Sequence, residues 1–489
     1  MDQPNNPQPI IADRVLINGI ETTLTFTEDG KLRWNAGGQK CLTVEREVLG
    51  FCTQGRKIRL RCVVVKGDGV CCVKDRGGLV RENFLFELFS EDSLRLWCQK
   101  LREYIDSLGR PKRLFIFVNP FGGKKIASKI FVDVVKPLLE DADIQITMQE
   151  TKHQLHAKKV AHTMDLLKYD GVICVSGDGL VVEVVNGLLE REDWSSAIKM
   201  PIGVVPAGTG NGMAKSLLDS VGQPCTAFNA VLAIIRGHKR SLDVATILQG
   251  EIKFFSVLML AWGLVADIDI ESEKYRWMGS ARLDFYALQR IFHLRRYDGR
   301  VCFVPAPGFE DHGEPANYND GSSDTHRNHD SSLEQAFDVQ QNGYQGSDVK
   351  LENLDWRAIN GPFVSVWLHN VPWGGEDTLA APDAKFSDGY LDLIIIRDCP
   401  KLALLSLMTE MSSGGHVRSP LSTYLKVKAF VLEPGPRTDD PTKEGIIDSD
   451  GEVLARGKGT YKDGQKGLMS YDKLQITIDQ GLATVFSPV

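Results

Sequence analysis

Three segments of this 489-residue chain repeat one pattern, in which a short apolar run leads through a glycine turn into an amphipathic stretch. In the clearest copy, the apolar residues 171–176 precede the turn Ser176-Gly177-Asp178-Gly179. After this turn, valine and leucine recur at intervals of three and four residues, which predicts a helix with an apolar stripe. The pattern therefore predicts an α/β unit in which a buried strand is followed by a tight turn and a helix.

The other two copies lie before and after this one in the chain. Residues 114–118 precede a turn at 119–124, and residues 202–205 precede a turn at 206–212. The carboxyl ends of parallel strands meet at one edge of a sheet, so the three turns are expected to converge there. Glycine turns and helix N-termini bind anions through main-chain N–H groups, which predicts a nucleotide-phosphate site. Such turns are also common as plain connectors, and the chain contains neither a P-loop nor a dinucleotide-binding fingerprint.

Composition and charge narrow the class of protein. The net charge is −7, from 57 basic and 64 acidic residues, which argues against broad nucleic-acid binding. Ten cysteines without C-x-x-C spacing indicate reduced thiols in a cytoplasmic protein. The N-terminus lacks the features of a signal peptide. The most apolar run, residues 254–266, is shorter than the roughly 20 residues that span a bilayer.

Changes in hydrophobic period divide the chain into three expected domains. Residues 1–110 contain short β-propensity runs and end in a predicted helix that carries Trp97, an order that resembles a pleckstrin-homology-like module. Residues 111–242 contain the three repeated units and form the expected α/β nucleotide-binding domain. Residues 243–489 are rich in predicted strands, which indicates a mainly antiparallel β-sandwich. The polar segment 306–355 within it is expected to be a disordered insertion.

Three long motifs carry a resemblance to a known family. Residues 176–191 (SGDGLVVEVVNGLLER) and 206–217 (PAGTGNGMAKSL) resemble the catalytic segment of the diacylglycerol kinase-like superfamily, and within it the sphingosine kinases, or sphingoid long-chain base kinases. Residues 261–282 (AWGLVADIDIESEKYRWMGSAR) resemble the part that separates sphingosine kinases from diacylglycerol kinases. The resemblance implies a diacylglycerol kinase-like α/β domain followed by a lipid-binding β-sandwich domain.

The family implies a transferase of sphingolipid metabolism. Such a kinase moves the γ-phosphate of ATP, with Mg²⁺, to the primary hydroxyl of sphingosine and related sphingoid bases. The implied partners are ATP, the lipid and, by peripheral contact, the cytosolic face of an endomembrane or the plasma membrane. The magnesium ligands and the oligomeric state stay unassigned. Three alternatives remain open: a ceramide kinase, which the N-terminal module favours, a diacylglycerol kinase, and a catalytically inactive lipid-sensing scaffold.

Asp178 is the candidate catalytic base. Phosphoryl transfer needs a phosphate cradle, a divalent ion and a group that receives the proton of the acceptor hydroxyl. A carboxylate in a glycine turn can serve as that group, because the proton moves late in a loose transition state. The alternative is a helix cap that accepts from the amide of Val181. The resemblance favours the base and places Ser176, Gly177, Asp178 and Gly179 at the lipid substrate.

The resemblance also assigns the remaining site residues. Asp269 would meet the amine and hydroxyl head of the lipid, since a carboxylate is what an ammonium group needs. Without the resemblance, the acids around it indicate only a solvated charged face. The implied nucleotide-binding residues are Asn119, Pro120, Phe121, Gly123, Lys124, Thr151, Ser176, Gly177, Glu183, Gly208, Thr209, Gly210, Asn211, Arg276, Arg282, Asp450, Gly451 and Glu452. Candidates to line a cleft for the lipid tail are Leu264, Val265, Ile268, Phe285, Leu288, Phe292 and Leu294.

Two positions depart from the family pattern. Lys125 stands where the family usually has a glycine, which puts the local backbone path in doubt. Met259 stands where some relatives carry a serine near the lipid head, so one polar contact to the substrate is expected to be lost or replaced.

Overall fold

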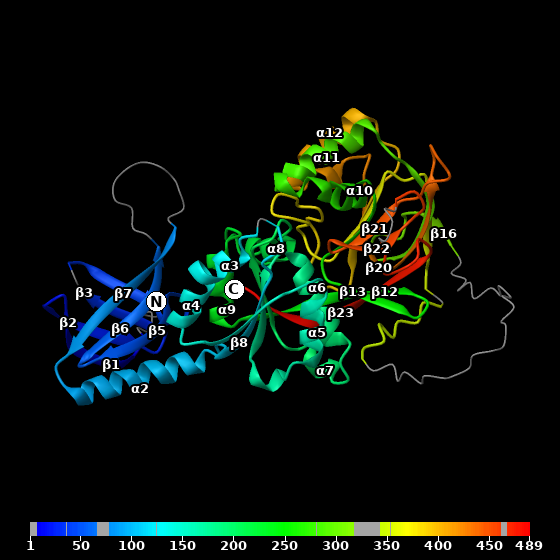
Figure 1. The fold of residues 1–489 in the computed structure, drawn as a ribbon. Helices are drawn as coiled ribbons and strands as arrows, with labels where there is room; N and C mark the ends of the chain where they lie inside the picture. Colours follow the sequence, from blue (N-terminus) through cyan, green and yellow to red (C-terminus); the bar gives the residue numbers. More distant parts are fainter. Residues whose placement is uncertain are drawn as a thin grey trace.

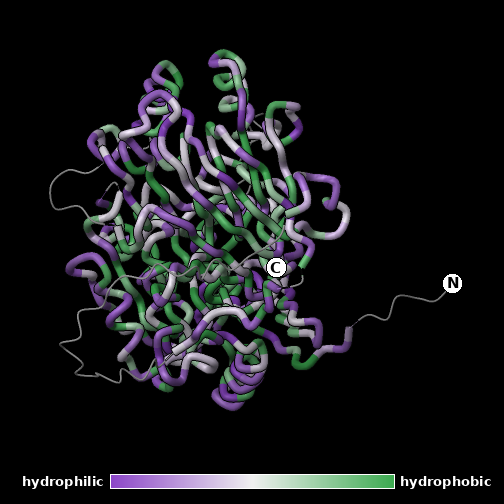
Figure 2. Tube along the Cα trace, turned by 90° about the vertical axis from the view of Figure 1, so that its right-hand side faces the viewer, coloured by the Kyte–Doolittle hydropathy of each residue, from purple (hydrophilic) through white to green (hydrophobic). Residues whose placement is uncertain are grey.

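The three predicted regions follow one another along the molecule (Figure 1), with the N-terminal module at one end, the α/β domain in the middle and the strand-rich domain at the other end. The computed structural model describes residues 7–35, 37–65, 78–123, 125–279, 281–316, 343–352, 354–460 and 467–489, without the side chain of Arg276. Hydrophobic residues concentrate along the inner strands, whereas the outer loops are largely hydrophilic (Figure 2). The N-terminal module and the strand-rich domain each have a core of their own, and a further core is shared by the α/β domain and the strand-rich domain.

The N-terminal module is an antiparallel sheet closed by a helix. The sheet has the order β4-β3-β2-β1-β7-β6-β5 and consists of β1 (Pro9–Ile17), β2 (Ile20–Thr27), β3 (Lys31–Asn35), β4 (Gln39–Thr43), β5 (Val48–Gln54), β6 (Lys57–Val65) and β7 (Leu79–Leu88). Helix α2 (Glu91–Ser107) begins where Ser90 Oγ accepts a hydrogen bond from the amide of Ser93, and its Trp97 is fully buried against the sheet. The β-rich module with a closing helix is thus present.

Ionic and main-chain contacts fasten this module to the α/β domain. The guanidinium of Arg110 donates to the carbonyls of Val44, Glu45, Val48 and Leu49 at 2.8–3.1 Å. Arg61 and Asp143 approach to 2.6 Å across the same junction. A single half-buried guanidinium at the domain junction therefore satisfies four carbonyls of the N-terminal module.

The α/β domain contains the predicted parallel sheet. Strands β8 (Arg113–Val118), β9 (Gln145–Glu150), β10 (Gly171–Ser176) and β11 (Ile202–Pro206) pair in parallel in the order β9-β8-β10-β11. Because side chains alternate, Phe115 and Phe117 pack towards α5 (His156–Thr163) and α6 (Asp178–Leu189). Leu114 and Ile116 pack on the opposite face towards α4 (Lys136–Asp141) and α9 (Ala227–Arg236). The three glycine turns consequently lie at one edge, as the sequence predicted.

The strand-rich domain encloses a second core. Its strands are β12 (Lys239–Gln249), β13 (Ile252–Ser256), β14 (Met259–Gly263), β15 (Tyr297–Pro305), β16 (Glu314–Pro315), β17 (Arg357–Asn360), β18 (Ser365–His369), β19 (Leu391–Ile396), β20 (Thr423–Arg437), β21 (Ile446–Ser449), β22 (Glu452–Arg456) and β23 (Leu474–Phe486). They pair antiparallel and bury Trp262, Phe303 and Phe430 between them. Helices α10 (Leu264–Glu271), α11 (Ala281–Phe292) and α12 (Lys401–Glu410) lie at its outer end (Figure 1).

The C-terminal strand corrects the predicted division at residue 243. β23 pairs with β12 and β20 along most of its length, but its end joins β11, where Val485 lies opposite Ile202 in parallel. Residues 483–486 therefore complete the sheet of the α/β domain, and the two domains share one continuous sheet. A boundary drawn from the sequence misses this shared sheet, because the two paired strands β11 and β23 are separated by more than half of the chain.

The predicted disordered insertion at 306–355 is wrong at both flanks. Before residue 317, the amide of Ala316 donates to the carbonyl of Trp356, and after residue 342 the ring of Tyr344 packs on Trp194 with centroids 4.5 Å apart. Leu351 is buried in a small cluster with Trp356. Residues 317–342, the middle of the prediction, lie outside the described residues. Within the described chain, no helix has the length and apolar character needed to cross a membrane.

Candidate active site

The three glycine turns touch through their main chains. A Cβ added to Gly208 would lie 2.3 Å from Cα of Gly177, and one added to Gly123 would lie 2.7 Å from the main chain of Gly208 and Thr209. The amide of Asp178 donates to the carbonyl of Gly210 at 3.2 Å. No side chain larger than hydrogen fits at these contacts. The predicted glycines therefore form one main-chain cradle built from three separate strand ends.

Local hydrogen bonds shape the first turn. Asn119 Oδ1 accepts from the amides of Phe121 and Gly122 at 3.0 and 3.1 Å, which closes the turn around Pro120. Phe121 is 61% exposed at its rim, and Lys124 lies outside the described residues. Lys125 has φ +56°, a left-handed conformation that favours glycine. The backbone at Lys125 thus keeps the left-handed conformation that a glycine would adopt there, although the residue departs from the family pattern.

The third turn is held by Asn211. Its Oδ1 accepts from the amide of Gly208 at 3.0 Å, while Nδ2 donates to the carbonyl of Gly208 and to Oε1 of Glu376, at 3.1 and 2.6 Å. Glu376 belongs to the strand-rich domain and was not expected from the sequence. Asn211 therefore ties the cradle to the second domain.

Asp178 is buried and bonds to a neighbouring helix. Its carboxylate accepts from the amides of Gly212 and Met213, at 2.8 and 3.0 Å, at the start of α8 (Gly212–Asp219). The predicted alternative, a cap on its own helix, is wrong, because α6 has Gly177 as N-cap and no side-chain cap. Burial raises the pKa of Asp178 to about 6. The two hydrogen bonds from main-chain amides lower this pKa, whereas the negative charges of Asp450 and Asp269 raise it further. The carboxylate is thus held by two main-chain amides, and its pKa lies nearer to neutrality than that of an ordinary aspartate.

The turn between β21 and β22 closes over the start of α6. Asp450, at φ +55°, accepts from the amides of Leu258 and Met259 at 2.7 and 2.9 Å, and burial raises its pKa to about 6. The next residue, Gly451, is also left-handed, at φ +80°. A Cβ on Gly179 would meet Glu452 Oε1 at 3.8 Å and the carbonyl of Asp450 at 3.9 Å. The predicted Asp-Gly-Glu segment therefore lies beside the candidate base.

Two acids of α10 lie in separate surroundings. Asp267 is fully buried and accepts from Tyr297 Oη at 2.8 Å and Arg295 Nη1 at 3.1 Å. Asp269 faces the site instead, and burial raises its pKa while the charge of Arg282 opposes the shift. The reading of these acids as a solvated face is therefore wrong. Arg282 itself is largely buried and donates to Ser272 Oγ and to the carbonyl of Asp269, at 2.5 and 3.3 Å.

The remaining predicted nucleotide residues support the edges of the cradle. Glu183 accepts from the amides of Leu155 and Ala157, both at 3.0 Å, and so caps α5. Thr151 is buried where β9 ends, and its amide donates to the carbonyl of Val118. Ser176 is buried at the end of β10. The side chain of Arg276 is not among the described groups, and nothing is assigned to it.

The candidates for the lipid cleft differ in burial. Leu264 and Ile268 of α10 are buried with Leu404 of α12, whereas Val265 and Leu294 are only partly buried. Phe285, Leu288 and Phe292 of α11 are 46%, 48% and 65% exposed, so they form surface rather than core. Met259 is buried, and its sulfur accepts from Trp367 Nε1 at 3.0 Å. At the position where some relatives carry a serine, the side chain of Met259 therefore contacts Trp367 within the protein.

The acids beside the glycine cradle would suit a magnesium ion that is carried by the phosphates of a nucleotide. In the described part of the chain, no group of three or more histidine, cysteine, aspartate or glutamate side chains could hold a metal ion. Mg²⁺ commonly keeps its waters and binds phosphates with only one or two carboxylates. A glycine cradle flanked by acids suits such an ion, although its ligands stay unassigned.

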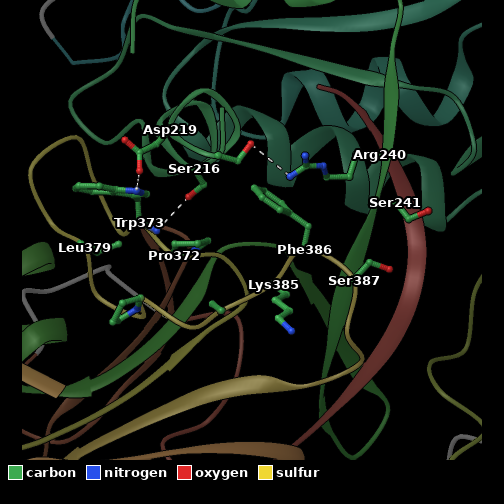
Figure 3. A pocket seen from close by; sticks show the side chains of 13 residues that line it. Ser216, Asp219, Arg240, Ser241, Pro372, Trp373, Leu379, Lys385, Phe386 and Ser387 are labelled. Atoms are coloured by element: carbon green, nitrogen blue, oxygen red, sulfur yellow. Dashed lines mark hydrogen bonds between the residues drawn. The ribbon is translucent and has the colours of Figure 1, made fainter. Parts of the chain in front are cut away.

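A cavity of about 490 Å³ lies beyond the far end of α8 (Figure 3). Its walls include Asp219, Arg240, Trp373 and Phe386, and none of the predicted site residues lines it. The main-chain amide of Trp373 donates to Ser216 Oγ at 3.0 Å, and the indole Nε1 of Trp373 donates to Asp219 Oδ2 at 3.1 Å. Helix α8 therefore separates this cavity from the glycine cradle at its N-terminus.

Comparison with known proteins identifies both domains. The Diacylglycerol kinase catalytic domain matches residues 113–247, and the YegS C-terminal NAD kinase beta sandwich-like domain matches residues 336–462. Sphingosine kinase 1 of Arabidopsis thaliana is 64% identical over 99% of this chain and 97% of that protein. Sphingosine kinase 2 of the same organism is 63% identical over 100% and 99%. The human Ceramide kinase is 30% identical over 76% of this chain and 69% of that protein.

The main-chain contact between Gly177 and Gly208 generates a prediction. Gly208→Ala forces the two turns apart, because the new Cβ would lie 2.3 Å from Cα of Gly177. We expect ATP binding to weaken at least about tenfold and stability to fall by about 1–3 kcal/mol, as for overpacked sites. Calorimetric titration with ATP and thermal melting measure both effects. Gly375→Ala is the control, since nothing lies within 4 Å of its Cβ; equal ATP affinity in both variants would contradict the cradle.

Proposed function

The chain belongs to the sphingosine kinase family, and on that premise we propose that it transfers the γ-phosphate of ATP to the primary hydroxyl of a sphingoid base. The observation that carries the proposal is the position of a buried, raised-pKa carboxylate, Asp178, between the glycine cradle and a second acid, Asp269. The products are ADP and the sphingoid base 1-phosphate. The greater identity to sphingosine kinases than to the ceramide kinase supports a sphingoid base as the acceptor.

The cradle would bind the triphosphate. The amides of Gly208 and Asp178 are already taken by Asn211 and by the carbonyl of Gly210, but α6 starts without a side-chain cap, so its amides after Asp178 can meet an anion. The amides that start α8 are already taken by Asp178. The phosphates are therefore expected at the turns and at α6 rather than at α8. Mg²⁺ bound with ATP supplies charge neutralisation at the phosphates during transfer.

Asp178 would receive the proton of the lipid hydroxyl. In the transfer, the hydroxyl oxygen bonds to the γ-phosphorus, the bond from that phosphorus to the bridging oxygen of ADP breaks, and the hydroxyl proton passes to Asp178. The two amides of α8 hold the carboxylate in place for this step. A pKa of about 6 leaves it ionised at neutral pH and more basic than an ordinary aspartate.

Asp269 would recognise the cationic head of the lipid. A carboxylate at this depth discriminates an amine from a neutral group, because a buried charge without its partner is costly. Ceramide and diacylglycerol carry no such cation, so Asp269 argues against these alternatives. An inactive scaffold has no need of Asp178, Asp269 and Asp450 gathered at one place.

The first prediction from this mechanism concerns the base. Asp178→Asn keeps the size of the side chain and one accepting oxygen but removes the proton acceptor. We expect kcat to fall by at least about 10²-fold, with ATP affinity nearly retained and stability lowered by about 1 kcal/mol for the weakened cap. Steady-state kinetics with labelled ATP and sphingosine measure the loss.

The pH profile provides an independent check of the same role. Because the base must be ionised, activity of the wild type should decline as pH falls through about 6 and stay level above it. If Asp178→Asn keeps nearly normal turnover, Asp178 acts only as a cap for α8, and another group must accept the proton.

The second prediction concerns Asp269. Removing one partner of a partly desolvated ion pair costs about 3–5 kcal/mol, so Asp269→Asn should raise KM for sphingosine a hundredfold or more. KM for ATP should hardly change. The assay offers sphingosine, phytosphingosine, ceramide and diacylglycerol side by side to both proteins, and the wild type should favour the two amines.

Asp267→Asn is the matched control for this experiment. Asp267 lies two residues away on the same helix but belongs to a buried network with Arg295 and Tyr297. We expect this variant to melt at a lower temperature while keeping its preference for amines. If Asp269→Asn handles sphingosine as the wild type does, a neutral-lipid kinase becomes the better interpretation.

We infer that the outer end of the strand-rich domain touches the membrane that holds the lipid. Phe285, Leu288 and Phe292 form one exposed stripe on α11, and Leu402 of α12 is 82% exposed. Lys401 Nζ donates to the carbonyl of Phe292, which brings the two helices together. These four side chains form an apolar end surface suited to an interfacial contact. The contact would be peripheral, on a cytosolic membrane face.

Leu402→Glu tests this surface. Losing one buried leucine from an interfacial contact is worth about 1.5–3 kcal/mol, so vesicle binding should weaken at least about tenfold. Co-sedimentation with phosphatidylcholine vesicles that contain sphingosine measures it, and turnover of detergent-dispersed sphingosine should not change. The control is Leu167→Glu, at a leucine 90% exposed on the α/β domain. Equal vesicle binding by the two variants would rule out the end surface.

A further inference from the structure

Asp448 points from β21 into the site beside Asp269. It lies opposite Ala261 of the neighbouring strand β14, and the small alanine leaves room for its side chain. A β-bulge between Ile447 and Asp448 interrupts the pairing of β21 with β22 at this position. Bulges of this kind redirect side chains near active sites. The strand therefore presents a carboxyl group on a face that otherwise carries apolar residues.

Asp448 has no donor group to satisfy it. The residue is fully buried, and neither carboxylate oxygen receives a hydrogen bond from the described residues. Its carboxyl contacts that of Asp269, a contact that becomes a hydrogen bond only when the pair shares a proton. Burial and the charges of Asp269 and Asp450 raise the pKa of Asp448 well above its usual range.

The other buried aspartates of the described chain all accept hydrogen bonds. Asp178 and Asp450 accept from main-chain amides, as does Asp243 from Gly389 and Gly481. Asp392 accepts from Lys426 and Tyr424, and Asp267 from Arg295 and Tyr297. Asp448 alone among these six buried aspartates lacks a donor. Folding gains nothing from such a group, since an apolar side chain at the same place would avoid its desolvation.

A cationic ligand would remove this cost. Two carboxyl groups in contact resist ionising together unless a positive charge lies between them. Arg282 is directed to Asp269 rather than to Asp448, since its Nη1 donates to Ser272 Oγ and to the carbonyl of Asp269, and its charge lowers the pKa of Asp269. An ammonium group carries several N–H donors and could bond to both carboxyl groups at once.

We propose that Asp448 is a second specificity-determining residue, which with Asp269 forms a paired-carboxyl site for the ammonium group of the lipid. This proposal rests on the proposed function and extends it. Asp269 provides the principal counter-charge, and Asp448 accepts a further N–H or the adjacent hydroxyl of the head. The pair thereby favours a free amine over an N-acylated or neutral head.

The variant Asp448→Asn tests the pair. The amide of asparagine can donate to Asp269, so the fold keeps its shape while one acid is lost. We expect KM for sphingosine to rise about tenfold, with kcat and KM for ATP within about twofold of the wild type. The melting temperature should stay equal or rise. A gain in stability together with weaker amine recognition distinguishes a binding residue from a structural one.

A substrate pair sharpens the result. The wild type and the variant are offered sphingosine and an analogue whose amine is replaced by a hydroxyl. The ratio of kcat/KM for the amine over the analogue should fall about tenfold in Asp448→Asn. Asp448→Ala, which removes the carboxyl group altogether, should lower this ratio as well, and it tests the proposal if the asparagine variant folds poorly.

Asp392→Asn is the matched control, because Asp392 is equally buried in the same domain but satisfied by Lys426 and Tyr424. It should melt at a lower temperature and keep the amine preference. Unchanged KM and preference in both Asp448 variants would overturn the proposal. A wild type that fails to phosphorylate sphingosine would instead overturn the proposed function, so the two failures are distinguishable.

Discussion

Two hydrogen bonds from the start of α8 to the carboxylate of Asp178 determine how the candidate site is arranged. Asp178 follows β10 and α8 follows β11, so these bonds fix the second glycine turn against the third. The contact between Gly177 and Gly208 is possible only at that spacing. The positive end of a helix also stabilises the ionised acid against burial. The result is a rigid carboxylate with a pKa of about 6 beside the expected phosphates.

The second domain supplies the rest of the site. Asp450 and Glu452 come from the turn between β21 and β22, and Asp269 comes from α10. They can reach Asp178 because β23 runs through both domains and joins the α/β sheet at β11. Asn211 and Glu376 add a contact between the domains at the cradle itself. The proposed site needs both domains, since Asp178 belongs to the α/β domain and Asp269 to the strand-rich domain.

Several buried acids make the site costly for folding. Burial raises the pKa of Asp178, Asp450, Asp269 and Asp448, and among them only the first two are satisfied by main-chain amides. Asp448, which no donor of the described residues satisfies, breaks the rule that buried charges are matched within the protein. Such violations are expected where a ligand provides the missing partner. The cationic head of a sphingoid base has the chemistry to do so.

The sequence by itself determined the repeated strand, turn and helix units, because the periods of strands and helices and the demand for glycine are local properties. It also led to Asp178, Asp269 and residues 450–452 through long motifs that resemble sphingosine kinases. Only the tertiary structure decided that Asp178 caps α8, that Asp267 and Asp269 lie in separate surroundings, and that Asp448 meets Asp269. The bonds that place Asp450 join it to residues that lie 191 and 192 positions away. Neither periodicity nor spacing encodes such contacts, because they arise from how distant strands pair.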